Sequence, residues 1–293
     1  MKAASQPAPP SQPVVVDFSV YMRERFFQLI LRARQAVLAL KQDRNPEAVH
    51  GLRVALRRLR AALRAIRPVT DNYYLQSIDA SIKEIAALSG EARDLEVMIE
   101  TIEALPGLAD DTRAALAPWL EGMRARERET RAGLKARLDE RDILLPLKQL
   151  RAYLVLPARP DKKTAVEIAL GAVDVVLRPV ARDLKKIRKR RGKTPWLHGL
   201  RIKCKRLRYG TEFFQDLLPE VYRDVARSAR IMQNRLGELH DHDFILARLG
   251  RETTLDAGTR AALESALRER RAEILERTIR KSDEHRRVLA RFA

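Results

Sequence analysis

The amino-acid sequence predicts an all-α protein, and three observations lead to this fold class. Ala, Leu, Arg and Glu dominate the 293 residues, and these residues lose little freedom on entering a helix. Aromatic residues make up only 5% of the chain, and runs of β-branched residues are scarce. Pro, Gly and capping residues divide the chain into long segments of helical length. With 45% hydrophobic residues, such helices can bury a sizeable core.

The first half is expected to contain four long helices. The opening MKAASQPAPPSQP has no apolar core, so residues 1–13 are predicted to form a disordered Pro-rich arm. Helices are predicted over 14–41, from the Asn45-Pro46 start signal to near Pro68, over 71–105, and over 110–139, with a short apolar segment at 143–156.

The pattern then recurs after a linker marked by Pro157 and Pro160. Helices are predicted over 163–191, from Thr194-Pro195 to near Pro219, over 220–249, and over 259–291. The chain is therefore interpreted as one helical domain, 14–293, with repeat halves of about 14–156 and 162–293.

Two sequence motifs support an internal duplication. The segment VHGLRV from Val49 reappears as LHGLRI from Leu197, and RRLR at 57–60 reappears as KRLR at 205–208, with an offset of 148 residues. A weaker match pairs Gly90-Glu91 and Arg93-Asp94 with Gly237-Glu238 and His240-Asp241, with an offset of 147 residues. Two matches in the same order at nearly one offset indicate a repeated unit.

Each copy of the motif predicts a helix with a cationic stripe. Five side chains of the first copy share a stripe about 80° wide on a helical wheel, opposite a row of leucines (Leu52, Leu56, Leu59 and Leu63). The stripes consist of His50, Arg53, Arg57, Arg60 and Arg64 in the first copy and His198, Arg201, Lys205 and Arg208 in the second. Glu212 takes the fifth position of the second stripe and weakens that end. Arg58 and Arg206 lie near 80° on the other side of the histidine and are secondary candidates.

Such a stripe predicts a linear anionic ligand. Cations three or four residues apart repel each other on an isolated helix, so the stripe needs an anion to offset the repulsion. The first stripe is roughly 21 Å long, which suits an extended anion better than one small phosphate. The whole chain carries 58 Lys and Arg against 39 Asp and Glu, a net charge of +19 that favours anionic partners.

The two motif copies, with LSGEARDLEV from Leu88 and LGELHDHDFIL from Leu236, resemble the CHAD family (conserved histidine α-helical domain) over nearly the whole chain after the arm. The resemblance implies a duplicated pair of four-helix bundles with pseudo-two-fold symmetry and a basic central groove or cavity. It also implies binding of inorganic polyphosphate by the two stripes. We expect this binding to be non-catalytic, and a scaffold or targeting role at polyphosphate-containing granules in the cytoplasm is compatible with it. Some relatives carry a preceding triphosphatase domain. The Glu127-Arg128-Glu129 run only superficially resembles that enzyme's motif, because it is expected in a helix and not in a strand.

Two other functions, nucleic-acid binding and metal-dependent phosphate hydrolysis, are alternatives to polyphosphate binding. A nucleic-acid-binding protein could use the same basic surface, but single-strand binders usually add aromatic stacking residues, and only Tyr209 lies next to a stripe. A metal-dependent phosphohydrolase is less favoured. Neighbouring residues of one helix, such as His240-Asp241-His242-Asp243, fan out by about 100° and cannot all face one ion. Asp94 and Asp241 are expected instead to pair with or orient arginines.

The remaining features predict no catalytic chemistry. Cys204, the only cysteine, falls on the apolar side of its helix and is expected to pack in the core. No catalytic residue, metal ligand or cofactor is predicted, and no segment is apolar enough to span a membrane. The oligomeric state, and whether the two stripes form one site or two, are left open.

Overall fold

All regular secondary structure in the described part of the chain is helical, which confirms the all-α class. The computed structural model describes residues 17–41, 48–70, 72–139, 142–156 and 163–292. Its helices are α1 (Phe18–Lys41), α2 (Ala48–Ile66), α3 (Tyr73–Ala87), α4 (Gly90–Glu103), α5 (Asp110–Asp139), α6 (Leu145–Leu154), α7 (Ala165–Leu184), α8 (Ile187–Arg190), α9 (Thr194–Phe213), α10 (Tyr222–Leu249) and α11 (Ala257–Ala290). The predicted arm over residues 1–13, the Asn45-Pro46 start signal and the prolines of the linker lie outside the described residues.

The sequence predicts two single helices that the structure divides. The predicted 71–105 helix is broken between α3 and α4, where the Ser89 hydroxyl donates to the Ala86 carbonyl at 3.0 Å. A serine side chain that bonds the preceding backbone competes with the helical pattern, and this explains the turn. The predicted 163–191 helix ends at Leu184, where the Lys186 N–H bonds the Asp183 carbonyl at 2.9 Å in a tight turn before α8.

The α9 helix ends at Phe213, six residues before the predicted stop at Pro219. Phe213 and Phe214 are both buried, and their rings pack edge to face with centroids 4.9 Å apart. The Tyr21 hydroxyl of α1 donates to the Phe213 carbonyl at 2.5 Å and so satisfies a carbonyl that the helix leaves free. Packing against α1 therefore sets the end of α9.

Two groups of buried hydrophobic residues hold the helices together. The larger core contains residues of both halves, among them Phe26, Leu59, Leu177 and Leu207. The smaller core, which includes Met98 and Ile245, is built by α4, α5, α10 and α11. The fully buried Cys204 belongs to the larger core, as the sequence predicts.

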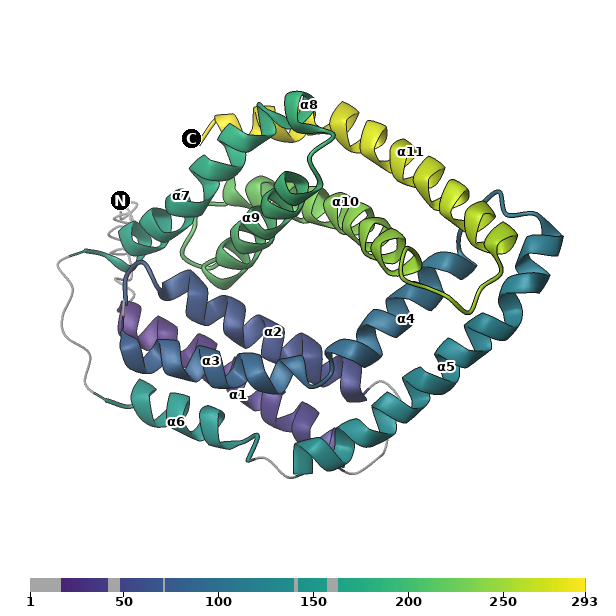
Figure 1. Ribbon diagram of the computed structural model, residues 1–293. Coiled ribbons are helices and arrows are strands. Elements are labelled where there is room, and N and C mark those ends of the chain that lie inside the picture. Colours follow the sequence, from purple (N-terminus) through teal and green to yellow (C-terminus); the bar gives the residue numbers. More distant parts are fainter. Residues whose placement is uncertain (1–16, 42–47, 71, 140–141, 157–162, 293) are drawn as a thin grey trace, which may run out of the picture.

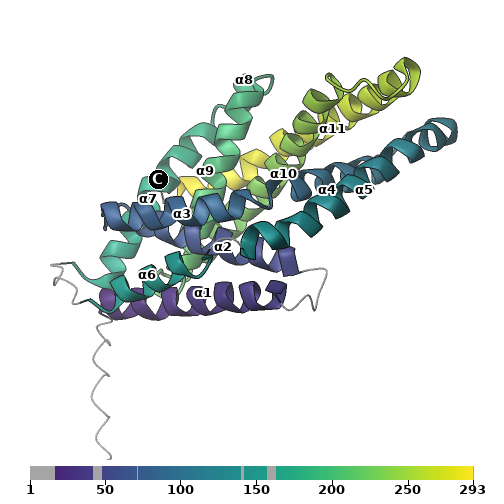
Figure 2. The ribbon, with the colours of Figure 1, turned by 60° about the horizontal axis from the view of Figure 1, so that its bottom comes forward.

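The helices that carry the repeated motif, α2 and α9, pack against each other in the middle of the molecule (Figure 1). Helices α1 and α3 pack on α2, and α6 packs on α1 and α3, whereas α7 and α10 pack on α9. The α4–α5 and α10–α11 pairs extend from this body in the same direction (Figure 2). Among the described residues, no helix is both long and apolar enough to cross a bilayer.

Candidate functional site

The cationic stripes of α2 and α9 meet in one cluster. Their leucines are buried in the larger core as predicted, which leaves the opposite faces for the basic side chains. Lys205 of α9 marks the meeting point. Burial lowers its pKa to about 8, and so do the positive charges of Arg201 on its own helix and of Arg57, Arg64 and Arg60 on α2. We call Arg57, Arg60, Arg64, Arg201 and Lys205 the central cluster. In this cluster, residues of both stripes lie close together.

One carboxylate of α3 is shared by two members of the central cluster. Asp79 accepts from Arg60 Nε at 2.8 Å and from Arg64 Nε at 3.1 Å. A single negative charge cannot neutralise two guanidinium groups, so this part of the cluster keeps a net positive charge. The sequence did not identify Asp79 as a partner, because it lies on another helix.

The end of the α9 stripe is neutralised within its own helix. Arg208 Nε donates to Glu212 Oε1 at 2.7 Å, and its guanidinium lies over the Tyr209 ring at 5.3 Å from the centroid. The prediction that Glu212 weakens this end agrees with this contact. Arg208 is therefore less available to an external anion than the other members of its stripe.

Three cations of the central cluster have no such compensation. Among the described residues, Arg57, Arg201 and Lys205 form no ion pair or hydrogen bond with a carboxylate. Arg201 also has a buried Nε atom without a hydrogen-bond partner. Arg201 and Lys205 are partly buried, whereas Arg57 is exposed to solvent. An unpaired cation that is partly buried is costly, so an external anion would relieve that cost at Arg201 and Lys205.

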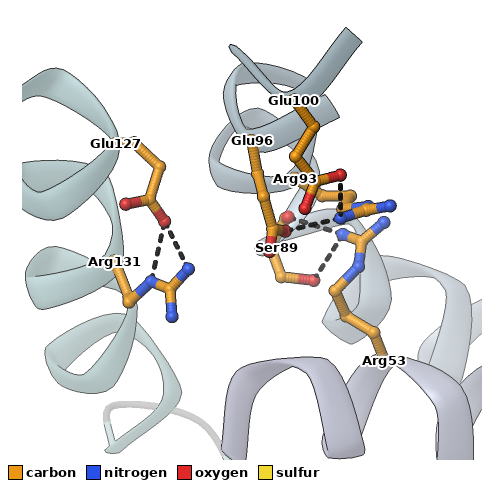
Figure 3. A network of polar contacts seen from close by, with 7 residues as sticks. All are labelled: Arg53, Ser89, Arg93, Glu96, Glu100, Glu127 and Arg131. Carbon is orange, nitrogen blue, oxygen red and sulfur yellow. Dashed lines mark hydrogen bonds and ion pairs between the residues drawn. The ribbon is translucent and has the colours of Figure 1, made fainter. Parts of the chain in front are cut away.

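The N-terminal end of the α2 stripe borders a cavity of about 310 Å³. Arg53 donates to the Ser89 carbonyl at 2.5 Å and to the Ser89 hydroxyl at 3.0 Å, so the break between α3 and α4 supplies its acceptors. Figure 3 shows Arg53 bonded to Ser89, Arg93 beside the α4 carboxylates, and Arg131 beside Glu127 of α5. The cavity is lined by Val49, His50, Arg53, Ala92, Arg93, Glu96 and Arg131.

The carboxylates at this cavity distinguish it from the central cluster. Arg93 pairs with Glu96 at 2.8 Å and lies 3.6 Å from Glu100, while Arg131 of α5 pairs with Glu127 at 2.6 Å. These contacts neutralise much of the positive charge locally. The arginines at this cavity thus pair with three carboxylates, whereas those of the central cluster pair with Asp79 alone among the described residues.

A histidine pair occupies the N-terminal end of the α9 stripe. The Nδ1 atoms of His198 and His240 are 3.1 Å apart, so one of them must carry the hydrogen that the other accepts. Burial lowers the pKa of His240 to about 4, and the nearby charges of Arg201 and His198 act in the same direction. His240 is consequently neutral at physiological pH. The sequence offered no signal for this contact, because 42 residues separate the partners.

The run from His240 to Asp243 does not converge on one point. His240 faces His198, His242 Nδ1 donates to the Glu238 carbonyl at 2.8 Å, and Asp243 binds Arg271 Nε at 2.5 Å. In the described part of the chain, no group of three or more His, Cys, Asp or Glu side chains is arranged to hold a metal ion.

Asp94 and Asp241 are acidic residues within this basic region. Burial raises the pKa of both carboxyl groups, and nearby arginines oppose that rise. Those arginines include Arg53 and Arg248 for Asp94, and Arg201 for Asp241. Both carboxylates therefore interact electrostatically with arginines of the two motifs, in line with their predicted role of orienting arginine side chains.

Arg58 and Arg206, the secondary candidates from the sequence, are not members of the central cluster. Arg58 lines two neighbouring cavities of about 260 and 430 Å³ between α1 and α2, together with Arg32. Arg206 is an exposed residue of α9. Glu127 and Glu129 lie in α5, so they are helical as expected and not part of a strand.

Comparison with known proteins adds to these observations. The family model described as the CHAD domain matches residues 24–250. The crystal structure of the CHAD domain from the plant Ricinus communis is similar to this fold, with a TM-score of 0.72 and 18% sequence identity, covering 98% of this chain and 97% of that one. No curated protein matches the sequence.

The His198–His240 pair generates a prediction about pH. Because the folded state holds the pKa of His240 near 4, below its ordinary 6.5, the folded protein binds fewer protons than the unfolded chain between these values. The free energy of unfolding should therefore fall as the pH is lowered from about 6.5 to about 4. His240→Gln should remove about 1–2 kcal/mol of that fall, as measured by urea denaturation across this pH range.

The control for this experiment is His50→Gln, which changes an exposed histidine of the other motif. This variant should keep the pH dependence of the wild-type protein. An unchanged slope in the His240→Gln variant would show that the histidine pair does not control acid stability.

Proposed function

The chain belongs to the CHAD domain family, and from this premise we propose that it binds inorganic polyphosphate without catalysing a reaction on it. The observation that carries the proposal is that Arg57, Arg201 and Lys205 at the α2–α9 interface form no ion pair with a carboxylate among the described residues. A chain of phosphates offers closely spaced negative charges along a line, and the two cationic stripes offer positive charges along two adjoining helices. The two stripes are thus complementary to polyphosphate in both linear shape and charge.

The distribution of paired arginines suggests how the polymer lies. The middle of the site has the least internal neutralisation, whereas Arg53 and Arg208 at the two ends already have acceptors in Ser89 and Glu212. We therefore place the strongest contacts at the central cluster. Arginine forms paired hydrogen bonds with phosphate oxygens, which makes Arg57 and Arg201 the principal ligands.

The site is less suited to nucleic acid. Tyr209, the aromatic residue beside the α9 stripe, is only 8% exposed, so it offers no open ring for a base. We further propose that binding takes place in the cytoplasm, where the protein would act as a scaffold at polyphosphate-containing granules.

Neutralising the uncompensated cations should abolish tight binding without weakening the fold. In the triple variant Arg57→Gln, Arg201→Gln and Lys205→Gln, the affinity for long-chain polyphosphate should fall by about 100-fold or more, because charge-assisted contacts are lost. The melting temperature should stay the same or rise, because these cations repel one another in the free protein. Fluorescence anisotropy and thermal denaturation measure the two effects.

A matched control removes the same net charge elsewhere. The variant Arg137→Gln, Lys189→Gln and Arg280→Gln changes exposed residues of α5, α8 and α11. Its affinity should stay within about threefold of the wild type, since distant exposed charges are screened by salt. If the control weakens binding as much as the triple variant, the attraction is a general effect of net charge and the site is wrong.

Binding should also depend steeply on salt. About three to five neutralised phosphates would give a slope of about −2 to −4 in a plot of log affinity against log salt concentration, using the coefficient for single-stranded polyanions. Titrations between low and physiological salt measure this slope. A flat response would contradict a site built from cations.

Competition separates the proposed ligand from nucleic acid. Labelled polyphosphate bound to the protein should be displaced by unlabelled polyphosphate at a lower phosphate concentration than by duplex DNA. The physical reason is that the cations lie along two packed helices that offer no exposed aromatic side chain. More effective displacement by DNA would favour a nucleic-acid-binding protein.

A further inference from the structure

Helix α1 presents a row of hydrophobic side chains to solvent. Val20, Leu31 and Leu38 are 45%, 53% and 41% exposed, and Phe27 is half-buried. The four residues are separated by seven, four and seven positions, so they lie within about 40° of one another around the helix axis. Figure 2 shows α1 along the outer edge of the molecule, with the other helices on one side of it. The row therefore faces away from the core that α1 helps to build.

Two charged residues extend this row into the pattern of a coiled coil. We call the extended row the α1 seam, and it consists of Val20, Glu24, Phe27, Leu31, Arg34 and Leu38. Its members are spaced by four, three, four, three and four positions, which is the heptad spacing of helices that pair side by side. Among the described residues, neither Glu24 nor Arg34 forms an ion pair, although both are exposed. The seam thus has both apolar and charged residues that the chain itself leaves without partners.

The α1 seam is complementary to a second copy of itself that runs in the opposite direction. In such a pair, each hydrophobic residue of one copy faces a hydrophobic residue of the other, and each glutamate faces an arginine. The residue numbers in each facing pair add up to 58, and the pairs are Val20 with Leu38, Glu24 with Arg34, and Phe27 with Leu31. A two-fold symmetric interface requires this property, because any contact between two positions must occur twice with the copies exchanged.

The charged residues of the seam also select the direction of the second copy. In a parallel pair, Glu24 would face the same glutamate of the other copy, and Arg34 would face the same arginine. Like charges that face each other in a seam disfavour that arrangement. In the antiparallel pair the same residues form two contacts between opposite charges. The pattern therefore favours the antiparallel arrangement on grounds of both apolar contact and charge.

We propose that the α1 seam is a homodimer interface, in which the α1 helices of two copies pack antiparallel about a two-fold axis. A second copy is the occupant that the sequence supports, because the seam itself supplies both the apolar and the opposite charged groups. A single pair of helices about 27 Å long makes a small interface, so the dissociation constant should be on the order of 100 μM. The central cluster lies on α2 and α9, so this inference does not depend on the proposed function.

The first test measures the mass of the full wild-type chain by sedimentation equilibrium. Each copy carries a net charge of +19, so the measurement is made at physiological salt, where the repulsion between copies is screened. Between about 10 and 500 μM protein, the average mass should rise from that of the 33.5 kDa monomer toward that of a dimer. A mass that stays at the monomer value throughout this range would overturn the proposal.

A matched pair of variants locates the interface. Leu31→Lys should weaken self-association by at least about tenfold, because it places a charge against Phe27 of the other copy. Val175→Lys makes the same kind of change at a position of α7 that is 61% exposed, and this variant should associate as the wild type does. Both positions are exposed, and circular dichroism should show unchanged helical content. Equal behaviour of the two variants would show that the α1 seam is not the interface.

Exchanging the charges tests the pairing of Glu24 with Arg34. Glu24→Arg alone and Arg34→Glu alone should each abolish self-association in the same concentration range, because like charges then face each other twice per dimer. An equimolar mixture of the two variants should form heterodimers, since an arginine of one variant then faces a glutamate of the other at both contacts. The double variant should regain the affinity of the wild type. Failure of both the mixture and the double variant to associate would refute the pairing.

Disulfide crosslinking tests the direction of the helices. Val20→Cys and Leu38→Cys variants, mixed and mildly oxidised, should form a disulfide between the two variants at least about fivefold faster than either variant crosslinks with itself. The native Cys204 is fully buried and does not compete. Faster crosslinking of Val20→Cys with itself would contradict the antiparallel arrangement.

The segment that precedes α1 is the competing occupant of the seam. A full chain that stays monomeric, together with a chain lacking residues 1–16 that dimerises, would show that this segment covers the seam. That result would overturn the proposal. Equal dimerisation of the two chains would support it.

Discussion

The rest of the site depends on one constraint, the burial of the apolar faces of α2 and α9 in a common core. Leu59 and Leu207 are completely buried, and each fixes the rotation of its helix about its axis. Once that rotation is fixed, the basic side chains lie on the side of each helix opposite its buried leucines. Hydrophobic burial thus supplies the free energy that offsets the repulsion among the arginines and Lys205.

The arginines along this interface differ in whether they have a hydrogen-bond or ion-pair partner within the chain. Ser89 and Glu212 satisfy arginines near the two ends, and Asp79 partly neutralises two arginines in the cluster. Arg57 and Arg201 form no ion pair or hydrogen bond with a carboxylate among the described residues. A protein selected only for stability would be expected to pair these side chains, as α5 and α11 do with their many Arg–Glu contacts. The proposal of an external anionic ligand rests on this unpaired centre.

The positive charges of the arginines lower the pKa of each titratable group beside them, but this effect adds to that of burial at some groups and opposes it at others. It adds to burial in lowering the pKa of His240 and of Lys205, while it counteracts burial at Asp94 and Asp241. These charges therefore help to keep the histidine neutral, favour loss of the proton from the lysine, and help to retain the negative charge of the two carboxylates. A bound polyanion would weaken each of these effects, which couples ligand binding to protonation.

Local patterns in the sequence determined the helical class and the membership of both stripes. The helical period is a property of consecutive residues, so it places Arg57 opposite Leu59 without any knowledge of the fold. The tertiary structure decided what local patterns do not contain: the break at Ser89, the sharing of Asp79 by two arginines, the contact of His198 with His240, and the position of Lys205 among arginines of the other motif. The break also serves a distant residue, since its carbonyl accepts from Arg53. Apart from the local Ser89–Ala86 bond, these features join residues that are well separated along the chain, and only the packing of one helix on another brings such residues within reach.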